Sequence, residues 1–451
     1  MRAIWFLCSI LAIVTEGLRY KVDDREAVDP NDVPVTHLPV GAVHVSEAEW
    51  AQFLEENLEP DLAPWKVKAP LRADYVWNLK DDLYKRGGPL PGVWRVVLVW
   101  KNKLYWVERD HVQSVGSAPQ DASDQIKSFG IRVTRWLTRG HLQLPDVLFM
   151  INVEDNRPRW CGPKQECVVP LISLGKTMDH EGNDTDILVP QLFFGDNTFY
   201  YHPWELKKDV AYFRGVPFCS GYWWNVSDTC LVACPRTYLA WRSDLDARTN
   251  RTPSYLDVGI VEPATLPWVN DTQGELYQKM KGCQPDSIPT VPRVGMWRHA
   301  RYKYLLQLEG ITFSCRLSQL LMTNSLVLFQ RQPFVEYFYR SLRPWVHYVP
   351  FWTAKAHSRG DWNSLDDVYG VIDGLRRREQ QDPKEVHRMV AAANAFATKF
   401  TTSYGRARYL KDALTAYKDL FPDMDQYLAQ FVEGLKANGT WTSTGGQEPT
   451  S

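Results

Sequence analysis

The feature that most constrains the fold is an alternation of short apolar runs and helix-like stretches through the second half of the chain. The apolar runs are strand-like, and the stretches between and after them have helical spacing. The predicted strands cover residues 210–213, 302–308, 325–329 and 345–350, and the predicted helices cover 315–322, 334–342, 363–378, 384–400 and 409–421. Strand–helix–strand order builds a parallel sheet with right-handed crossovers. The sequence therefore predicts an α/β fold.

The first half of the chain shows the same alternation. Residues 93–100 and 103–107 predict two strands separated by a Lys-Asn turn, and residues 126–137 have helical spacing. Residues 147–153 form a continuous apolar run, which is typical of a strand buried on both faces. Because a chain of 451 residues suggests two domains, we expect two α/β domains facing each other across a cleft. Ligands in such sheets bind at the carboxyl ends of the strands.

The N-terminus has the pattern of a targeting segment. Arg2 precedes an apolar run at residues 4–14, and residues 15–17 (Thr-Glu-Gly) offer cleavage positions. The run is shorter than the roughly 20 apolar residues that span a bilayer, so a cleaved signal peptide at 1–17 is favoured over a membrane anchor. Residues 18–60 predict a flexible lead-in with one short helix near 47–58, and residues 436–451 predict a disordered tail. No segment after the signal is expected to cross a membrane.

Cysteines and glycosylation sequons agree with passage through the secretory pathway. Of the 8 cysteines, one lies in the signal. Cys161 and Cys167 are close enough to clip one loop, and Cys315 is expected to be unpaired and buried. Two further bridges are expected among four cysteines, with three pairings open: Cys219, Cys230, Cys234 and Cys283. The sequons begin at Asn183, Asn225, Asn250, Asn270 and Asn438.

The charge balance argues against a nucleic-acid partner. The chain has 52 basic and 53 acidic residues, for a net charge of −1. Binding to nucleic acid or to an anionic membrane needs a basic stripe. A zinc site is not indicated either, because no Cys-x-x-Cys or His pair has the spacing of zinc ligands.

Asp155 is the first candidate for chemistry. It follows the predicted strand 147–153, which places it at the carboxyl end of that strand. An ordinary aspartate is ionised at neutral pH and can accept a proton as a general base. The alternative is a turn-forming aspartate that bonds its own loop.

The loop at residues 310–314, with Arg316 after it, is the second candidate. Ser314 is expected to cap the following helix, and free backbone N–H groups at a helix start favour a phosphate. Arg316 in the first helical turn opposes the helix dipole unless an anion offsets it. With Gly310 these residues suggest a diphosphate site, and an ordinary capped helix with an exposed ion pair is the alternative.

Three further positions could contact the same ligand. Arg214 and Gly215 follow the predicted strand 210–213, and Arg236 opens a predicted helix at 238–241. Guanidinium groups suit bidentate phosphate contacts, although scattered arginines are usually solvated. Glu336, on the predicted helix 334–342, could bind ribose hydroxyls or could be exposed.

At these residues the sequence resembles the protein O-glucosyltransferases of glycosyltransferase family 90, which include Rumi-like and CAP10-like proteins. The matching blocks keep the family's order, over roughly residues 90–420. They are Leu144-Pro145-Asp146 with 151–155, Asp186-Ile187 with Pro190, 211–215, 302–305, Gly310 with Ser314 and Arg316, 325–327, and Glu336 leading to 344–350.

The resemblance implies an inverting transferase that moves glucose or xylose from a UDP-sugar to a hydroxyl of a protein or glycan. Asp155 matches the general base, and Arg236 and Arg316 match arginines that bind the diphosphate. No metal is implied, and the Asp244-x-Asp246 pair lies away from any predicted strand end. The alternative is an inactive secreted carbohydrate-binding or scaffold protein on the same fold.

The resemblance also implies two Rossmann-like domains of the GT-B type. The acceptor-side domain is expected at 61–205, completed by helices at 395–435, and the donor domain at 206–394. The location implied is the lumen of the endoplasmic reticulum or Golgi, or the exterior, without a Lys-Asp-Glu-Leu-type signal. The sequence departs from the family at Val216, where serine is frequent, at residues 192–195, and at Glu154, where relatives often have arginine.

Overall fold

The computed structural model describes residues 33–85, 93–107, 112–114, 122–155, 161–162, 166–179, 182–193, 197–220, 224–227, 230–232, 234–263, 274–281, 288–352 and 367–441. The expected signal peptide, the lead-in up to residue 32, the tail from residue 442, Cys283 and the sequon at Asn270 lie outside these ranges. Within them, no helix combines the length and the apolar character that a membrane span requires.

A five-stranded parallel sheet forms the first of two large sheets, and its strands come from the second half of the chain. They are β11 (Lys208–Gly215), β14 (Leu256–Ile260), β15 (Tyr302–Gln307), β16 (Leu326–Gln330) and β18 (Val349–Phe351), in the order β14-β11-β15-β16-β18. Numbered along the chain, this order is 2-1-3-4-5. The direction of winding reverses between β11 and β15, and in such sheets that point is where ligands bind.

The second large sheet is mixed, with six strands. They are β4 (Val112–Ser114), β3 (Lys103–Val107), β2 (Trp94–Trp100), β5 (Val147–Asn152), β6 (Ile172–Ser173) and β9 (Ile187–Leu188), in that order. The first four pair antiparallel, and β5, β6 and β9 pair parallel. The predicted Lys-Asn turn joins β2 to β3 with φ of 49° at Lys101 and 58° at Asn102, the left-handed geometry of a tight hairpin. The mixed α/β class is confirmed.

Three small sheets and further helices accompany the two large sheets. A three-stranded sheet joins β17 (Phe334–Val335) to β7 (Lys176–Asp179) and β8 (Gly182–Asn183). Two-stranded sheets form from β1 (Thr36–Pro39) with β10 (Thr198–Tyr201), and from β12 (Trp224–Ser227) with β13 (Cys230–Val232). Besides α2 (Glu47–Asn57), α3 (Glu59–Lys66) and the C-terminal helices, the described helices are α4 (Asp74–Lys85), α5 (Asp124–Thr138), η1 (Trp204–Leu206), α6 (Pro235–Arg248), α7 (Glu275–Lys281), η2 (Met296–Arg301), α8 (Leu317–Leu320) and η3 (Tyr339–Ser341).

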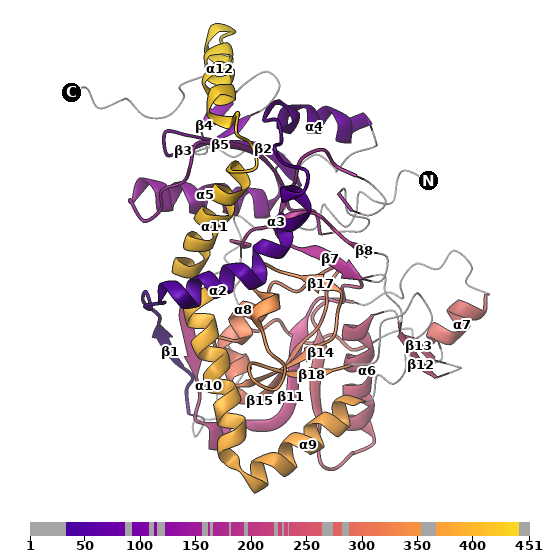
Figure 1. The fold of residues 1–451 in the computed structure, drawn as a ribbon. Coiled ribbons are helices and arrows are strands. Elements are labelled where there is room, and N and C mark those ends of the chain that lie inside the picture. The colour runs from indigo at the N-terminus through magenta and orange to yellow at the C-terminus, as the bar shows by residue number, and fades with distance from the viewer. Residues whose placement is uncertain are drawn as a thin grey trace.

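Four helices at the C-terminal end run past both large sheets (Figure 1). They are α9 (Asp367–Gln381), α10 (Pro383–Phe400), α11 (Ser403–Lys418) and α12 (Met424–Ala437). α10 packs against β16 of the parallel sheet, α11 against β9, and α12 against β5 of the mixed sheet. The chain therefore returns to the mixed sheet after it has built the parallel one.

The expected flexible lead-in needs correction for its described part. The predicted helix near residues 47–58 is α2 (Glu47–Asn57), which starts with a capping box between Ser46 and Glu49 and is followed by α3 (Glu59–Lys66). Trp50 and Phe53 of α2 are buried, and the Phe53 ring stacks on Phe400 of α10 at 4.2 Å between centroids. This amphipathic helix is part of the core, because its apolar face has a partner that lies far away in the sequence.

Two of the predicted elements in the second half take other forms. Residues 334–342 were expected to be a helix, but they form β17, which pairs with β7, and the short 3-10 helix η3. Pairing with a distant strand overrides the local helical spacing. Residues 345–350 were expected to be a strand, but the strand in this region, β18, covers only 349–351, because Trp345 has a φ of 62° and turns the chain.

Disulfides follow the cysteine predictions in the described residues. Cys161 is bonded to Cys167, and Cys219 to Cys234, which selects one of the three pairings left open. Cys230 is also disulfide-bonded. Cys315 has a free thiol, as expected, and is partly buried.

Candidate active site

Asp155 reaches its place through the end of β5. All six residues of that strand are buried, and the chain leaves the sheet at Val153. The backbone N–H of Glu154 donates to the side chain of Asn152 at 3.0 Å, which turns the chain at the strand end. Asp155 therefore stands at the carboxyl end of a buried strand, where the sequence placed it.

The loop after β15 brings the second half of the chain to Asp155. The N–H of Gly310 donates to the carbonyl oxygen of Thr312 at 2.9 Å, and the side chain of Gln307 donates to the carbonyl of Ser314 at 2.8 Å. These bonds hold a tight turn in which Thr312 is fully buried. Its hydroxyl donates to the Oδ1 atom of Asp155. Two segments 157 residues apart in sequence thus meet at the carboxylate.

Arg236 lies at the start of α6 and is buried beneath this loop. Its guanidinium donates to the carbonyl oxygens of Val216 at 3.0 Å and Leu308 at 3.3 Å. A Cβ atom at Gly310 would lie 3.2 Å from its Nη2 atom, so glycine permits the close approach. Burial, with the nearby Arg316 charge as the second cause, lowers the pKa of Arg236 to about 9.

Arg316, at the N-cap of α8, lies in the same region. Its Nη1 atom donates to the carbonyl oxygen of Arg214 at 2.6 Å, and burial lowers its pKa to about 10. A Cβ atom at Gly215 would lie 3.1 Å from its Nη2 atom. Both guanidiniums lie over the ring of Phe213, Arg236 at 5.4 Å and Arg316 at 5.0 Å from its centroid. Gly215, at the end of β11, leaves room for the second cation.

Within the described part of the chain, neither Arg236 nor Arg316 forms a salt bridge. Arg236 is 4% exposed, and buried cations are ordinarily paired. Asp155 and Glu309 are the carboxylates whose charges favour the ionised form of Arg236. Two neighbouring guanidinium groups have the chemistry to bind an anion with more than one charge, such as a diphosphate.

Three of the predicted site residues have different surroundings from those expected. The guanidinium of Arg214 is held by Asp257, with 2.5 Å between Nη2 and Oδ1, and lies over the ring of Tyr212. Ser314 was expected to cap a helix, but α8 begins only at Leu317, no side chain caps it, and the N-cap position is Arg316. The cap prediction is wrong because the chain after Ser314 makes a turn before the helix starts.

Glu336 is buried and lies between β17 and η3 rather than on a helix. The hydroxyl of Tyr339 donates to its carboxylate at 3.0 Å. Burial raises the pKa of Glu336 to about 8, against a smaller opposing effect of the Arg406 charge. Of the two alternatives, exposure on the surface is excluded.

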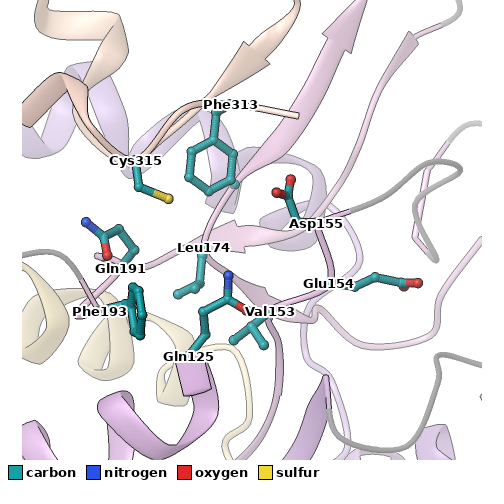
Figure 2. Close-up of a pocket in the computed structure, with 10 residues that line it drawn as sticks. Gln125, Val153, Glu154, Asp155, Leu174, Gln191, Phe193, Phe313 and Cys315 are labelled. Carbon is teal, nitrogen blue, oxygen red and sulfur yellow. The ribbon is translucent and has the colours of Figure 1, made fainter. Parts of the chain in front are cut away.

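A pocket opens beside Asp155 and is drawn in Figure 2. It measures about 380 Å³ including the space open to solvent. Its lining comes from both halves of the chain and includes two amides, Gln125 and Gln191, and two aromatic rings, Phe193 and Phe313. The carboxyl groups of Asp155 and Glu154 point in different directions (Figure 2), so the pair does not flank one bond.

Sequence reasoning missed several of these residues. Thr312 carries no local signal, because its partner lies far away in the chain. Glu309 is fully buried and accepts a hydrogen bond from Ser220 at 2.6 Å. Glu309 directly follows the predicted strand 302–308. It could therefore have been identified as a candidate in the same way as Asp155, by its place at the carboxyl end of a strand. The described residues contain no group of three or more His, Cys, Asp or Glu side chains placed to hold a metal ion.

Parts of this chain are similar to a protein family and to known proteins. Residues 265–423 match Glycosyl transferase family 90, a stretch that contains the Gly310–Arg316 loop and Glu336 but begins after Asp155 and Arg236. Protein O-glucosyltransferase 1 of Rattus norvegicus is 26% identical over 234 residues, which cover 46% of this chain and 49% of the relative. O-glucosyltransferase rumi of Drosophila melanogaster is 42% identical over 148 residues, covering 33% of this chain and 28% of the relative.

A third relative, the O-glucosyltransferase rumi homolog of Aedes aegypti, is 30% identical over 218 residues, covering 46% of this chain and 48% of the relative. The matches therefore span about half the length of the rat and mosquito relatives. The family match and the names of these relatives agree with the resemblance carried by the sequence blocks. Residues 265–423 of this chain thus match glycosyl transferase family 90, and the relatives to which the chain is similar are named O-glucosyltransferases.

Proposed function

We propose that this chain is an inverting glycosyltransferase that moves glucose or xylose from a UDP-sugar to a hydroxyl of a protein or glycan acceptor. The observation that carries the proposal is the meeting of Asp155 with a loop that lies beside the buried Arg236 and the partly buried Arg316, neither of which has a salt-bridge partner among the described residues. In this proposal the site holds a base next to two cations that bind the diphosphate. The names of the relatives supply the reaction class.

In the proposed reaction Asp155 removes the proton from the acceptor hydroxyl. The acceptor oxygen forms a bond to the anomeric carbon as the bond from that carbon to the UDP oxygen breaks, and UDP leaves with the electron pair. Attack from the face opposite UDP inverts the configuration. Arg236 and Arg316 stabilise the charge that develops on the diphosphate, where fixed donors in a site shielded from water act most strongly.

The proposal also assigns parts of the fold. The parallel sheet at 206–394 is the donor side, with the diphosphate at the ends of β11 and β15. The mixed sheet at 61–205, joined by helices 395–435, is the acceptor side, and the arrangement is of the GT-B type with two Rossmann-like domains. The donor site is also supported by residues that do not contact the donor directly, because their side chains face other protein groups or lie buried. These residues are Arg214, Ser314 and Glu336. The proposed location is the secretory-pathway lumen or the exterior.

We propose that the reaction needs no metal ion, because the two arginines supply the positive charge that a metal would provide. Transfer is therefore expected to persist in the presence of EDTA. A loss of transfer in EDTA that Mn²⁺ or Mg²⁺ restores would contradict this part of the proposal.

The central test compares Asp155→Asn with Arg316→Ala in transfer assays and in UDP binding. Asp155→Asn should lower turnover about 100- to 10,000-fold, since it removes the general base, and should leave UDP affinity nearly unchanged. Arg316→Ala should weaken UDP binding about 10- to 100-fold through the lost charged hydrogen bonds. Asp425→Asn, at an exposed aspartate of α12, is the matched control.

Two outcomes would overturn the proposal. Near-normal turnover of Asp155→Asn would show that Asp155 is not the general base. A wild-type protein that neither binds UDP nor transfers sugar from any member of a UDP-sugar panel would favour the alternative, an inactive carbohydrate-binding or scaffold protein. Mass spectrometry of the products from that panel identifies the donor sugar.

A further inference from the structure

The turn formed by residues 310–313 touches the mixed-sheet side of the molecule at two points. The hydroxyl of Thr312 donates to Oδ1 of Asp155. The ring of Phe313 covers Gly175, between β6 and β7, so closely that a Cβ atom there would lie 2.0 Å from a ring carbon. Thr312 is fully buried, and Phe313 is 8% exposed. These contacts fix the turn relative to the strand that carries the proposed base.

The same turn also lies beside the cationic site. Its N–H···O bond from Gly310 to Thr312 closes the turn at 2.9 Å, and Gly310 is the residue that leaves room for the Arg236 guanidinium. A few residues therefore connect the carboxylate with the proposed diphosphate site.

We propose that Thr312 is a positioning residue that holds the Asp155 carboxylate by Oδ1, so that Oδ2 takes the proton from the acceptor hydroxyl. This inference rests on the proposed transferase function. A threonine hydroxyl has one hydrogen to donate, and here it is directed at the carboxylate. The contact fixes the rotation of the side chain, and correct placement of a base is a large part of its effect on the rate.

The contact also affects when the base is ionised. A hydroxyl that donates to a carboxylate favours the charged form. Among the described residues, the groups near Asp155 include the Arg236 guanidinium, which acts in the same direction, the adjacent Glu154 carboxylate, which opposes it, and the Cys315 thiol. Burial raises the pKa of that thiol well above its ordinary value, so it stays neutral. Loss of the hydroxyl should therefore move the ionisation of the base to higher pH.

The test is Thr312→Val, which replaces the hydroxyl with a methyl group, together with Thr312→Ser, which keeps the hydroxyl. Thr312→Val should lower kcat about 10- to 100-fold, as expected for a lost hydrogen bond to a charged group. The KM for the UDP-sugar should change less than about threefold, because the diphosphate contacts remain. The acidic limb of the kcat/KM profile should move up by about one pH unit. Thr312→Ser should have nearly the kcat and the pH profile of the wild type.

Thr323→Val is the matched control. Thr323 is also fully buried, but its hydroxyl donates at 2.7 Å to the carbonyl oxygen of Leu320. This variant should lower the melting temperature without moving the pH profile. If Thr312→Val does not fold, Thr312→Ala is measured in the same way. An active wild type whose folded Thr312 variant keeps the normal kcat and pH profile overturns this inference alone, whereas an inactive wild type overturns the proposed function.

Discussion

Two arginines over one phenylalanine ring are the most informative feature at the scale of single residues. The charges of Arg236 and Arg316 repel each other, and the Arg316 charge is the second cause, after burial, of the lowered pKa of Arg236. Repulsion of this kind raises the free energy of the empty site and is relieved when an anion binds. The two glycines, Gly215 and Gly310, let the guanidiniums approach the ends of β11 and β15. A cationic site held in place by backbone carbonyls is preorganised for a developing negative charge.

Glu336 gives a prediction for the pH dependence of stability. Burial raises its pKa from 4.5 to about 8 in the folded protein. The stability that the protonated carboxyl contributes is therefore fully present below about pH 4.5 and is lost as the pH rises through about 8. Glu336→Gln removes this titration. Relative to the wild type, its free energy of unfolding should increase between about pH 5 and about pH 9, as measured by urea denaturation.

The control for this prediction is Glu433→Gln, at an exposed glutamate of α12. Its free energy of unfolding relative to the wild type should be the same at both pH values. Equal differences for Glu336→Gln at the two values would contradict the raised pKa.

At the scale of elements, the contact between Phe313 and Gly175 connects packing to activity. Gly175→Ala places a methyl group against the Phe313 ring, which must move and take the 310–313 turn with it. Overpacking of this kind costs about 1–3 kcal/mol of stability. We expect turnover to fall about tenfold, because the turn also positions Asp155. Phe313→Leu in the same chain should recover part of the turnover, since the smaller side chain makes room.

Gly41→Ala is the control, because a Cβ atom at Gly41 meets nothing within 4 Å. The readouts are the melting temperature and turnover of each single variant and of the double variant. If Gly175→Ala retains full turnover and the double variant adds the two single effects independently, this account of the turn is wrong.

The sequence predicted elements whose signal is local and failed where the partner is distant. The buried strand β5, the turn at Lys101 and Asn102, and helices α5 and α10 were predicted from alternation, turn chemistry and apolar spacing. β17 was predicted as helix, because nothing local shows that it pairs with β7, about 160 residues earlier in the chain. Ser314 was predicted to cap a helix, but its carbonyl oxygen accepts a hydrogen bond from the side chain of Gln307 in a tight turn. The local sequence does not show this contact.

The candidate site divides in the same way. Asp155, Gly215 and Gly310 were found because the ends of strands can be predicted from sequence, and the family resemblance added roles for Arg236 and Arg316. The hydrogen bond between Thr312 and Asp155 could not be predicted, since it depends on how two sheets meet. The sequence also could not show that Gly215 and Gly310 leave room for guanidinium groups, because these groups approach from other elements.

At the scale of the whole molecule, the two large sheets are held together by several contacts between distant segments. β17, from the second half of the chain, pairs with β7 from the first. α10, α11 and α12 continue from the parallel sheet to the mixed sheet (Figure 1). Near β7, the N-terminal helix α3 contributes Asp61, whose carboxylate bonds to Lys176 at 2.5 Å and to Arg340 of η3 at 2.7 Å. These contacts set the distance between the proposed base and the cationic site.

Asp61 therefore gives a prediction for the stability of the whole fold. Its carboxylate is fully buried between Lys176 and Arg340 and also accepts from the backbone N–H of Leu188 at 3.0 Å. Asp61→Asn leaves two cations without their anion, which should cost about 3–5 kcal/mol in thermal or urea unfolding. Glu59→Gln, which breaks the exposed pair with Lys66, should cost less than about 1 kcal/mol. Similar losses in the two variants would show that the buried cluster is dispensable, and the joining of the sheets would then depend on β17 and the C-terminal helices.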